Sequence, residues 1–103
     1  MRFFVKVSLD TATTNEAIKN NKLGETMNQI MGDLQPEAAY FIAEDGGRTA
    51  LLFVNMESNA DLVNVVEPWW LSFNAKVEIT PAMNGEDLEK AGPAFGAIVE
   101  KYG

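Results

Sequence analysis

Two apolar segments joined by Asp45-Gly46-Gly47 constrain the fold of this chain more than any other feature of its sequence. Residues 37–44 and residues 48–56 each alternate between two sets of side chains, as the residues of β-strands do. Glycine adopts the positive φ angles that tight hairpin turns require. The two segments are therefore predicted to pair as a β-hairpin, with a two-residue turn at Gly46-Gly47 or at Asp45-Gly46.

Both faces of this predicted hairpin are apolar. The choice of turn shifts the paired residues by two positions and leaves each side chain on the same face. One face would carry Tyr40, Ile42, Leu51 and Phe53, and the other would carry Phe41, Leu52, Val54 and Met56. Neither set is suited to contact with water, so the fold must cover both faces.

The segments before the hairpin predict a strand followed by helix. Residues 2–10 alternate, with Phe3, Val5, Val7 and Leu9 on one side and Phe4, Lys6, Ser8 and Asp10 on the other. A capping-box signal at residues 13–16 predicts a helix start, and Asn20-Asn21 predicts a break near residues 20–22. A longer helix is expected to end near Leu34 because its apolar residues keep helical spacing, namely Leu23, Met27, Ile30, Met31 and Leu34.

The segments after the hairpin predict a second helix, a fourth strand and a terminal helix. A cap signal at residues 58–61 precedes apolar residues at helical spacing, and Pro68 is expected to bend or end that helix within a turn. Residues 75–80 then alternate as a strand up to Pro81. A cap signal at residues 84–87 predicts a terminal helix that Gly92-Pro93 would kink or restart.

The order β-α-β-β-α-β with an added C-terminal helix is that of a ferredoxin-like α+β fold. We predict a single domain over residues 1–103, with a four-stranded antiparallel sheet in the spatial order 4-1-3-2. Helices cover one face of such a sheet. The other face would carry one apolar side of the hairpin together with Phe4, Lys6, Ser8, Lys76, Glu78 and Thr80.

Apolar side chains on this second face predict a symmetric homodimer packed sheet to sheet. Large exposed apolar patches usually mark an interface or a ligand site, and a second copy packed sheet to sheet would cover this one. A cavity between the sheets would suit a small apolar or aromatic molecule. The terminal helix could instead cover part of the face, which would weaken the case for a dimer.

Composition excludes several classes of function. The chain has no cysteine and no histidine, which rules out disulfides, thiolate sites and Ser-His-Asp catalysis within it. It also has no dense Asp/Glu loop, so we expect neither metal nor other cofactor. The net charge of −7 disfavours nucleic acid. No apolar run reaches the ~20 residues of a membrane span, and Lys6 interrupts the first apolar run, so we expect no membrane partner and a cytoplasmic location.

Four residues are candidates for ligand binding: Lys6, Tyr40, Trp70 and Glu78. Lys6 and Glu78 would be neighbours if the first and fourth strands pair, and the simpler interpretation is a cross-strand ion pair. Trp69 lies on the apolar side of its helix and is expected in the core, whereas Trp70 points about 100° away. For Trp70 the favoured alternative is packing against the terminal helix. Arg48 is expected to pair with Asp45 or Glu44.

Three segments carry a resemblance to a known family: residues 34–41 (LQPEAAYF), residues 67–75 (EPWWLSFNA) and Pro81-Ala82-Met83 ahead of residues 86–94 (EDLEKAGPA). The chain resembles a family of small, uncharacterised bacterial proteins over nearly its whole length, and that resemblance implies no established activity. More remotely, it is similar to the dimeric α/β-barrel superfamily, which includes cofactor-free monooxygenases, muconolactone-isomerase-like enzymes and haem degraders. The missing histidines argue against haem degradation.

Three hypotheses of function remain open at this point. The first is a dimeric module that binds a small molecule between its sheets. The second is a cofactor-independent isomerase or monooxygenase in which Lys6, Tyr40, Glu78 or an asparagine handles protons. The third is a structural dimer with no pocket. A buried lysine or carboxylate with a strongly shifted pKa would favour the enzyme.

Overall fold

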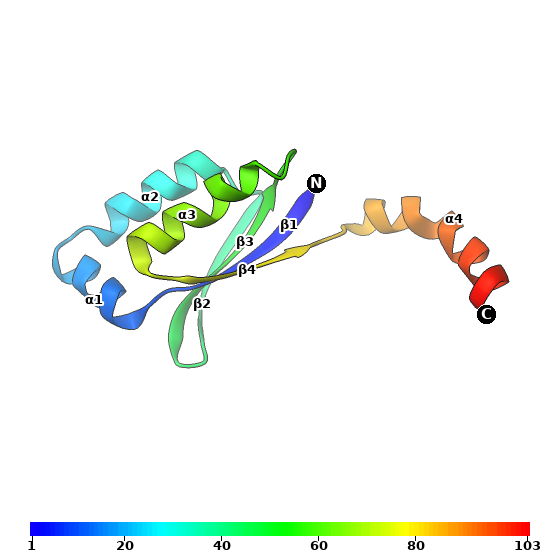
Figure 1. Cartoon of the computed structure of the whole chain (residues 1–103). Helices are drawn as coiled ribbons and strands as arrows, with labels where there is room; N and C mark the ends of the chain where they lie inside the picture. The colour runs from blue at the N-terminus through cyan, green and yellow to red at the C-terminus, as the bar shows by residue number, and fades with distance from the viewer.

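The computed structural model describes residues 1–103, and its elements follow the predicted order (Figure 1). The strands and helices are β1 (Arg2–Ser8), α1 (Thr11–Lys19), α2 (Leu23–Leu34), β2 (Ala38–Glu44), β3 (Gly47–Asn55), α3 (Asp61–Phe73), β4 (Lys76–Pro81) and α4 (Gly85–Tyr102). All strand pairs are antiparallel, and the sheet order is β2-β3-β1-β4. This confirms the predicted order and the ferredoxin-like α+β plan.

The β2–β3 hairpin turns at Asp45-Gly46, the second of the two predicted turns. Asp45 and Gly46 have φ angles of 51° and 75°, as a type I′ turn requires at both central residues. Tyr40 therefore pairs with Leu51, and Phe41 pairs with Ala50. The division of hairpin side chains between two faces agrees with the sequence.

Helices α1, α2 and α3 lie on one face of the sheet and cover the core (Figure 1). The sheet contributes Val5 and Val7 from β1 and Leu52 from β3, all without solvent exposure. Helix α3 contributes Trp69, which is also fully buried, and its ring lies 6.1 Å from that of Phe73. The predictions that Val5 and Val7 face the helices and that Trp69 belongs to the core are confirmed, and Leu52 shows which side of the hairpin joins them.

The start of α1 differs from the prediction. Asp10, rather than Thr13, is the N-cap, and its Oδ2 atom accepts hydrogen bonds from the backbone N–H and the hydroxyl of Thr13 at 3.0 and 2.7 Å. The prediction was wrong because the Thr13 hydroxyl acts as a donor to an upstream aspartate, one of the best N-cap residues. The predicted break is present: α1 ends at Lys19, and Asn21 has a φ of 57°.

Helices α3 and α4 each run through a proline. Helix α3 continues past Pro68 to Phe73 and ends where Asn74 takes a left-handed conformation, with φ 48°. Helix α4 is a single helix through Gly92 and Pro93, so of the two predicted alternatives, a kink or a restart, the restart is wrong. The Asn84 capping box starts this helix, and residues 93–102 extend it without a new cap.

Helix α4 projects beyond the end of the sheet and packs on neither of its faces (Figure 1). The molecule is consequently elongated, with extents of 60 × 28 × 20 Å. No residue of α4 is buried. The sheet face opposite α1, α2 and α3 thus stays uncovered within one chain.

Candidate functional site

Three of the four candidate residues lie in one row across the uncovered sheet face. Tyr40 on β2 pairs with Leu51 on β3, Leu51 pairs with Lys6 on β1, and Lys6 pairs with Glu78 on β4. Directly opposed residues of antiparallel strands point to the same side of a sheet. We call this surface the open face; it comprises this row and the two flanking rows Ala38, Phe53, Phe4, Thr80 and Ile42, Thr49, Ser8, Lys76.

Much of the open face is apolar, from the row of Phe4 and Phe53 to the β2 edge. The rings of Phe4 and Phe53 lie side by side, with centroids 5.3 Å apart. Tyr40 is 64% exposed and Ile42 is 41% exposed at the β2 edge. Five large apolar side chains, Leu51 among them, are therefore grouped on a face that no element of the chain covers.

The charged groups of the open face form two ion pairs. Lys6 Nζ donates a hydrogen bond to Oε1 of Glu44 at 2.8 Å, and Lys76 Nζ lies 3.4 Å from Oε1 of Glu78. The hydrogen bond with Glu44 raises the pKa of Lys6, and the negative charges of Glu44, Glu78 and Asp45 add to this effect, against a smaller opposing contribution from desolvation. Lys6 and Glu78 are neighbours as predicted, but Lys6 hydrogen-bonds Glu44 instead.

Trp70 does not belong to this group of residues. It lies on α3, in the helix layer on the other side of the sheet, and is 47% exposed. The expected packing of Trp70 against the terminal helix is wrong, because α4 leaves from the far end of β4 and extends away from α3 (Figure 1). Tyr40, Lys6 and Glu78 can thus form one site, and Trp70 cannot contribute to it.

None of the four candidates lines a pocket of the single chain. The four surface depressions are lined by other residues. One is a groove of about 540 Å³ between the hairpin and the helix layer, with Leu23, Met27 and Phe41 in its lining and Arg48 beside them. A pocket over the open face would need a second surface to enclose it.

Arg48 forms no ion pair, contrary to expectation. It pairs across the hairpin with Ala43, on the helix side of the sheet, whereas Glu44 lies on the opposite side and binds Lys6. Strand alternation therefore separates Arg48 from Glu44. The residue spacing in the sequence already contained this information, because positions 44 and 48 occupy different faces of a hairpin with an Asp45-Gly46 turn.

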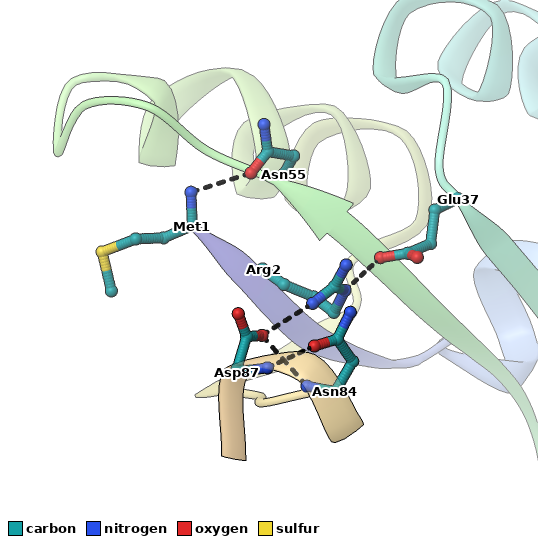
Figure 2. Close-up of polar contacts among 6 residues, drawn as sticks. All are labelled: Met1, Arg2, Glu37, Asn55, Asn84 and Asp87. Carbon is teal, nitrogen blue, oxygen red and sulfur yellow. Dashed lines mark hydrogen bonds and ion pairs between the residues drawn. The ribbon is translucent and has the colours of Figure 1, made fainter. Parts of the chain in front are cut away.

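A second polar cluster, which the sequence did not predict, fixes the base of α4 (Figure 2). The Arg2 guanidinium bonds to Glu37 through Nε and to Asp87 Oδ2 through Nη1, the latter at 3.0 Å. Asp87 Oδ2 also accepts from the backbone N–H of Asn84, and Asn84 Oδ1 accepts from that of Asp87. The hydrogen bond with Glu37 is the largest cause that raises the pKa of Arg2. Residues 2, 37 and 87 are too distant in sequence for a local pattern to show their contact.

Beyond this base, α4 carries an uncovered apolar surface. Its large apolar residues are all half exposed or more; we call them the α4 stripe: Leu88, Phe95, Ile98, Val99 and Tyr102. They occupy one arc of the helix because their spacing follows its 3.6-residue period. The single chain thus has two uncovered apolar surfaces, the open face and the α4 stripe.

Two classes of site find no support in these residues. The structure contains no group of three or more carboxylates placed to hold a metal ion. No helix combines the length and the hydropathy that a membrane crossing requires.

Comparison with known proteins adds a likeness to solved structures. A search of solved structures finds similarity to a chain described as "De novo designed protein Ferredog-Diesel", with a TM-score of 0.46 and 8% sequence identity over 79% of this chain and 85% of that chain. No family model matches the sequence, and no curated protein sequence matches it. The ferredoxin-like plan therefore follows from the strand order and the antiparallel pairing of this chain itself.

Proposed function

We propose that the protein acts as a homodimer in which the open faces of two copies pack together and hold a small apolar or aromatic molecule between them. The single observation that carries this proposal is the group of apolar side chains on a face that no element covers, with Tyr40 64% exposed. A two-fold axis brings the same patch of both copies together and covers both at once. This arrangement is the dimeric α/β-barrel type.

The polar groups of the central row give the proposed pocket its specificity. The Tyr40 hydroxyl both donates and accepts hydrogen bonds, and Lys6 carries a positive charge two strands away in the same row, beyond Leu51. The apolar part of a ligand would contact Phe4 and Phe53, whose rings form a continuous surface. We therefore expect a ligand with an aromatic or aliphatic body and one polar substituent.

A cofactor-independent isomerase or monooxygenase is the second candidate, and the state of Lys6 argues against a lysine base in it. A lysine that removes protons near neutral pH needs a depressed pKa, and the Glu44 hydrogen bond raises that of Lys6. The side chain of Lys6 is held as a cation, which suits binding and orientation. A structural dimer without a pocket is the third candidate. The proposal also includes membership of the small bacterial family and a cytoplasmic location.

The oligomeric state tests the proposal first. Sedimentation equilibrium should show a dimer at micromolar concentration, and Tyr40→Glu should raise its Kd at least about tenfold because it places a charge in the buried interface. Leu71→Glu is the matched control, since Leu71 is 83% exposed on α3, outside the open face. A stable wild-type monomer, or equal effects of both variants, would exclude this interface.

Native mass spectrometry tests the ligand separately. Protein purified without denaturation should carry a small molecule in the dimer, and mild denaturation should release it. Phe53→Ala should reduce its occupancy more than Leu71→Ala does, because only Phe53 lies on the open face. Two results together would exclude the ligand and favour a structural dimer without a pocket. The first is a dimer that carries no bound mass, and the second is a thermal stability that a set of aromatic and aliphatic compounds leaves unchanged.

A further inference from the structure

We infer that α4 is an arm that packs its stripe against a second copy of the chain, so that the dimer interface consists of the open face and α4 together. This inference rests on the proposed homodimer and specifies how its two copies are held. Four observations support it: the exposure of the α4 stripe, the composition of the helix, its anchored base and the position from which it leaves the sheet.

The exposed stripe is confined to one side of α4. Leu88, Phe95 and Tyr102 follow one another at seven-residue intervals, so they lie nearly in line along the helix. Glu86, Ala97 and Glu100 occupy the opposite side at the same helical spacing. A helix with one apolar arc and one polar arc normally buries the apolar arc, and nothing in the single chain does so.

The composition of α4 makes the helix dependent on packing. Gly92, Pro93 and Gly96 lie in its interior, and glycine and proline are the residues that destabilise a helix interior most. Helix propagation in water is favourable only for good helix formers, so these three residues weaken α4 as an isolated helix. Most helical stability in proteins comes from packing of an amphipathic face, so α4 requires a surface that its own chain does not provide.

The base of α4 is anchored, which gives the arm a defined direction. Asp87 closes the capping box with Asn84 and also bonds to Arg2 at 3.0 Å (Figure 2). Arg2 in turn bonds to Glu37, just before β2. These contacts tie the first turn of α4 to β1 and to the start of β2, so the stripe is presented at a fixed place beyond the end of the sheet.

The proposed occupant is a second copy because α4 is continuous with the open face. It leaves from β4, the edge strand that contributes Glu78 and Thr80 to that face. A second copy that packs on the open face with two-fold symmetry would extend beside this edge, where it can contact the stripe. The dimensions agree: the stripe from Leu88 to Tyr102 is about 21 Å long, and a seven-residue strand such as β1 is about 23 Å long.

The area of the interface also favours the arm. A four-stranded sheet about 20 Å long has a footprint of about 400 Å². Stable interfaces bury about 800 Å² of accessible surface on each partner. Because protruding side chains have more accessible surface than the flat footprint beneath them, the open face alone comes at most close to this area, and the α4 stripe adds a second apolar surface in each copy.

Charge reversal on the two sides of α4 tests the inference in the full chain. Phe95→Glu should raise the dimer Kd at least about tenfold, whereas Ala97→Glu, which adds the same charge on the opposite side, should change it less than about twofold. Circular dichroism and Trp fluorescence establish that the core of each variant stays folded. Equal effects of the two variants would overturn the arm.

Thiol protection tests the contact itself, because the chain has no cysteine of its own. Val99→Cys places the only thiol within the stripe, and Ala97→Cys places it on the opposite side. At concentrations well above the dimer Kd, a maleimide should react with the first variant at least about tenfold more slowly than at concentrations well below it. The second variant should react at the same rate in both conditions, and equal behaviour of the two would overturn the inference.

Tyr40→Glu separates a failure of the arm from a failure of the proposed function. If Tyr40→Glu weakens the dimer and Phe95→Glu does not, the open-face dimer stands and the arm is overturned. If Phe95→Glu weakens the dimer and Tyr40→Glu does not, the open-face dimer and the joint interface are overturned, and only the contact through α4 stands. A wild-type chain that stays monomeric at high micromolar concentration overturns both.

Discussion

Lys6 and Glu44 form a hydrogen-bonded ion pair across the open face, with 2.8 Å between Nζ and Oε1. Lys6 lies on β1 and Glu44 on β2, and strand β3 runs between them. The long lysine side chain therefore crosses β3 and lies over the face that we propose as the dimer interface. The pair keeps the charge of Lys6 fixed at one position of that face.

The stability that this pair contributes should depend on pH in one direction only. The hydrogen bond raises the pKa of Lys6 in the folded chain above its ordinary value of 10.5. The contribution is therefore fully present below pH 10.5 and is lost as the pH rises through the folded pKa. Urea unfolding of wild type and Lys6→Met should show wild type more stable at about pH 8, with the difference shrinking at about pH 11.

Lys76→Met is the control for this experiment. Lys76 and Glu78 form an ion pair at 3.4 Å with both side chains more than half exposed. Exposed pairs of this kind contribute little to stability, so the variant and wild type should have the same free energy of unfolding at both pH values. A difference between wild type and Lys6→Met that stays constant up to about pH 11 would contradict the assigned role of the charge.

Asp10 should stabilise the start of α1, with a pH dependence opposite to that of the Lys6–Glu44 pair. Its hydrogen bonds from the Thr13 hydroxyl and backbone N–H lower its pKa. A carboxylate whose pKa is lower in the folded chain stabilises the fold at pH values above its unfolded pKa. This stabilisation is lost as the pH falls through the folded pKa. Asp10→Ala should lower the Tm at pH 7 by a few degrees, and Asp10→Asn should lower it less because asparagine keeps a cap acceptor.

A scan of Tm against pH separates the charge of Asp10 from its hydrogen bonds. The gap between wild type and Asp10→Ala should narrow on acidification below about pH 4, where the aspartate takes up a proton in the unfolded chain. The Asp10→Asn variant has no such titration, so its own gap to Asp10→Ala should stay level. A wild-type gap that widens in acid would reverse the sign that we assign.

The hairpin turn should tolerate an added methyl group at Gly47 and not at Gly46. Gly46 has a φ of 75°, and a Cβ there would meet no atom within 4 Å, so the penalty is one of backbone conformation alone. Gly46→Ala should destabilise the fold by about 1–2 kcal/mol. Gly47→Ala, where φ is not positive, should change it by less than about 0.5 kcal/mol in urea unfolding. Equal values would show that the turn lies elsewhere.

Local patterns in the sequence predict most of the fold. Alternation assigns Val5 and Val7 to the core, and helical spacing assigns Trp69 to it, because burial on one face imposes these periods. Alternation also fixes which hairpin residues share a face. It does not choose between the turns at Asp45-Gly46 and Gly46-Gly47, because both keep the same faces and glycine is suited to either.

The candidate site is less accessible to sequence reasoning because its contacts join distant segments. Alignment of Tyr40 with Lys6 requires the registers of two strand pairs, which depend on the turn. The Arg2 cluster joins residues from three separate segments of the chain. Placement of α4 depends on the surface that covers its stripe, and an amphipathic pattern indicates that such a surface exists without giving its position.

The two tryptophans should behave as opposites in stability and in fluorescence. Trp69 is fully buried and its Nε1 atom has no hydrogen-bond partner, whereas Trp70 is 47% exposed. Trp69→Ala should cost about 3–5 kcal/mol in unfolding free energy through the cavity that it leaves. Trp70→Ala should cost less than about 1 kcal/mol, because its side chain contributes little to the core.

Single-tryptophan variants extend this prediction to the site. Trp70→Phe leaves only Trp69, which should emit at short wavelength and resist quenching by acrylamide. Trp69→Phe leaves only Trp70, which should emit at long wavelength and be quenched readily. Because Trp70 lies on the opposite side of the sheet from Tyr40, a ligand bound on the open face should leave its emission unchanged. Quenching of Trp70 by a bound ligand would place the binding site on the helix side.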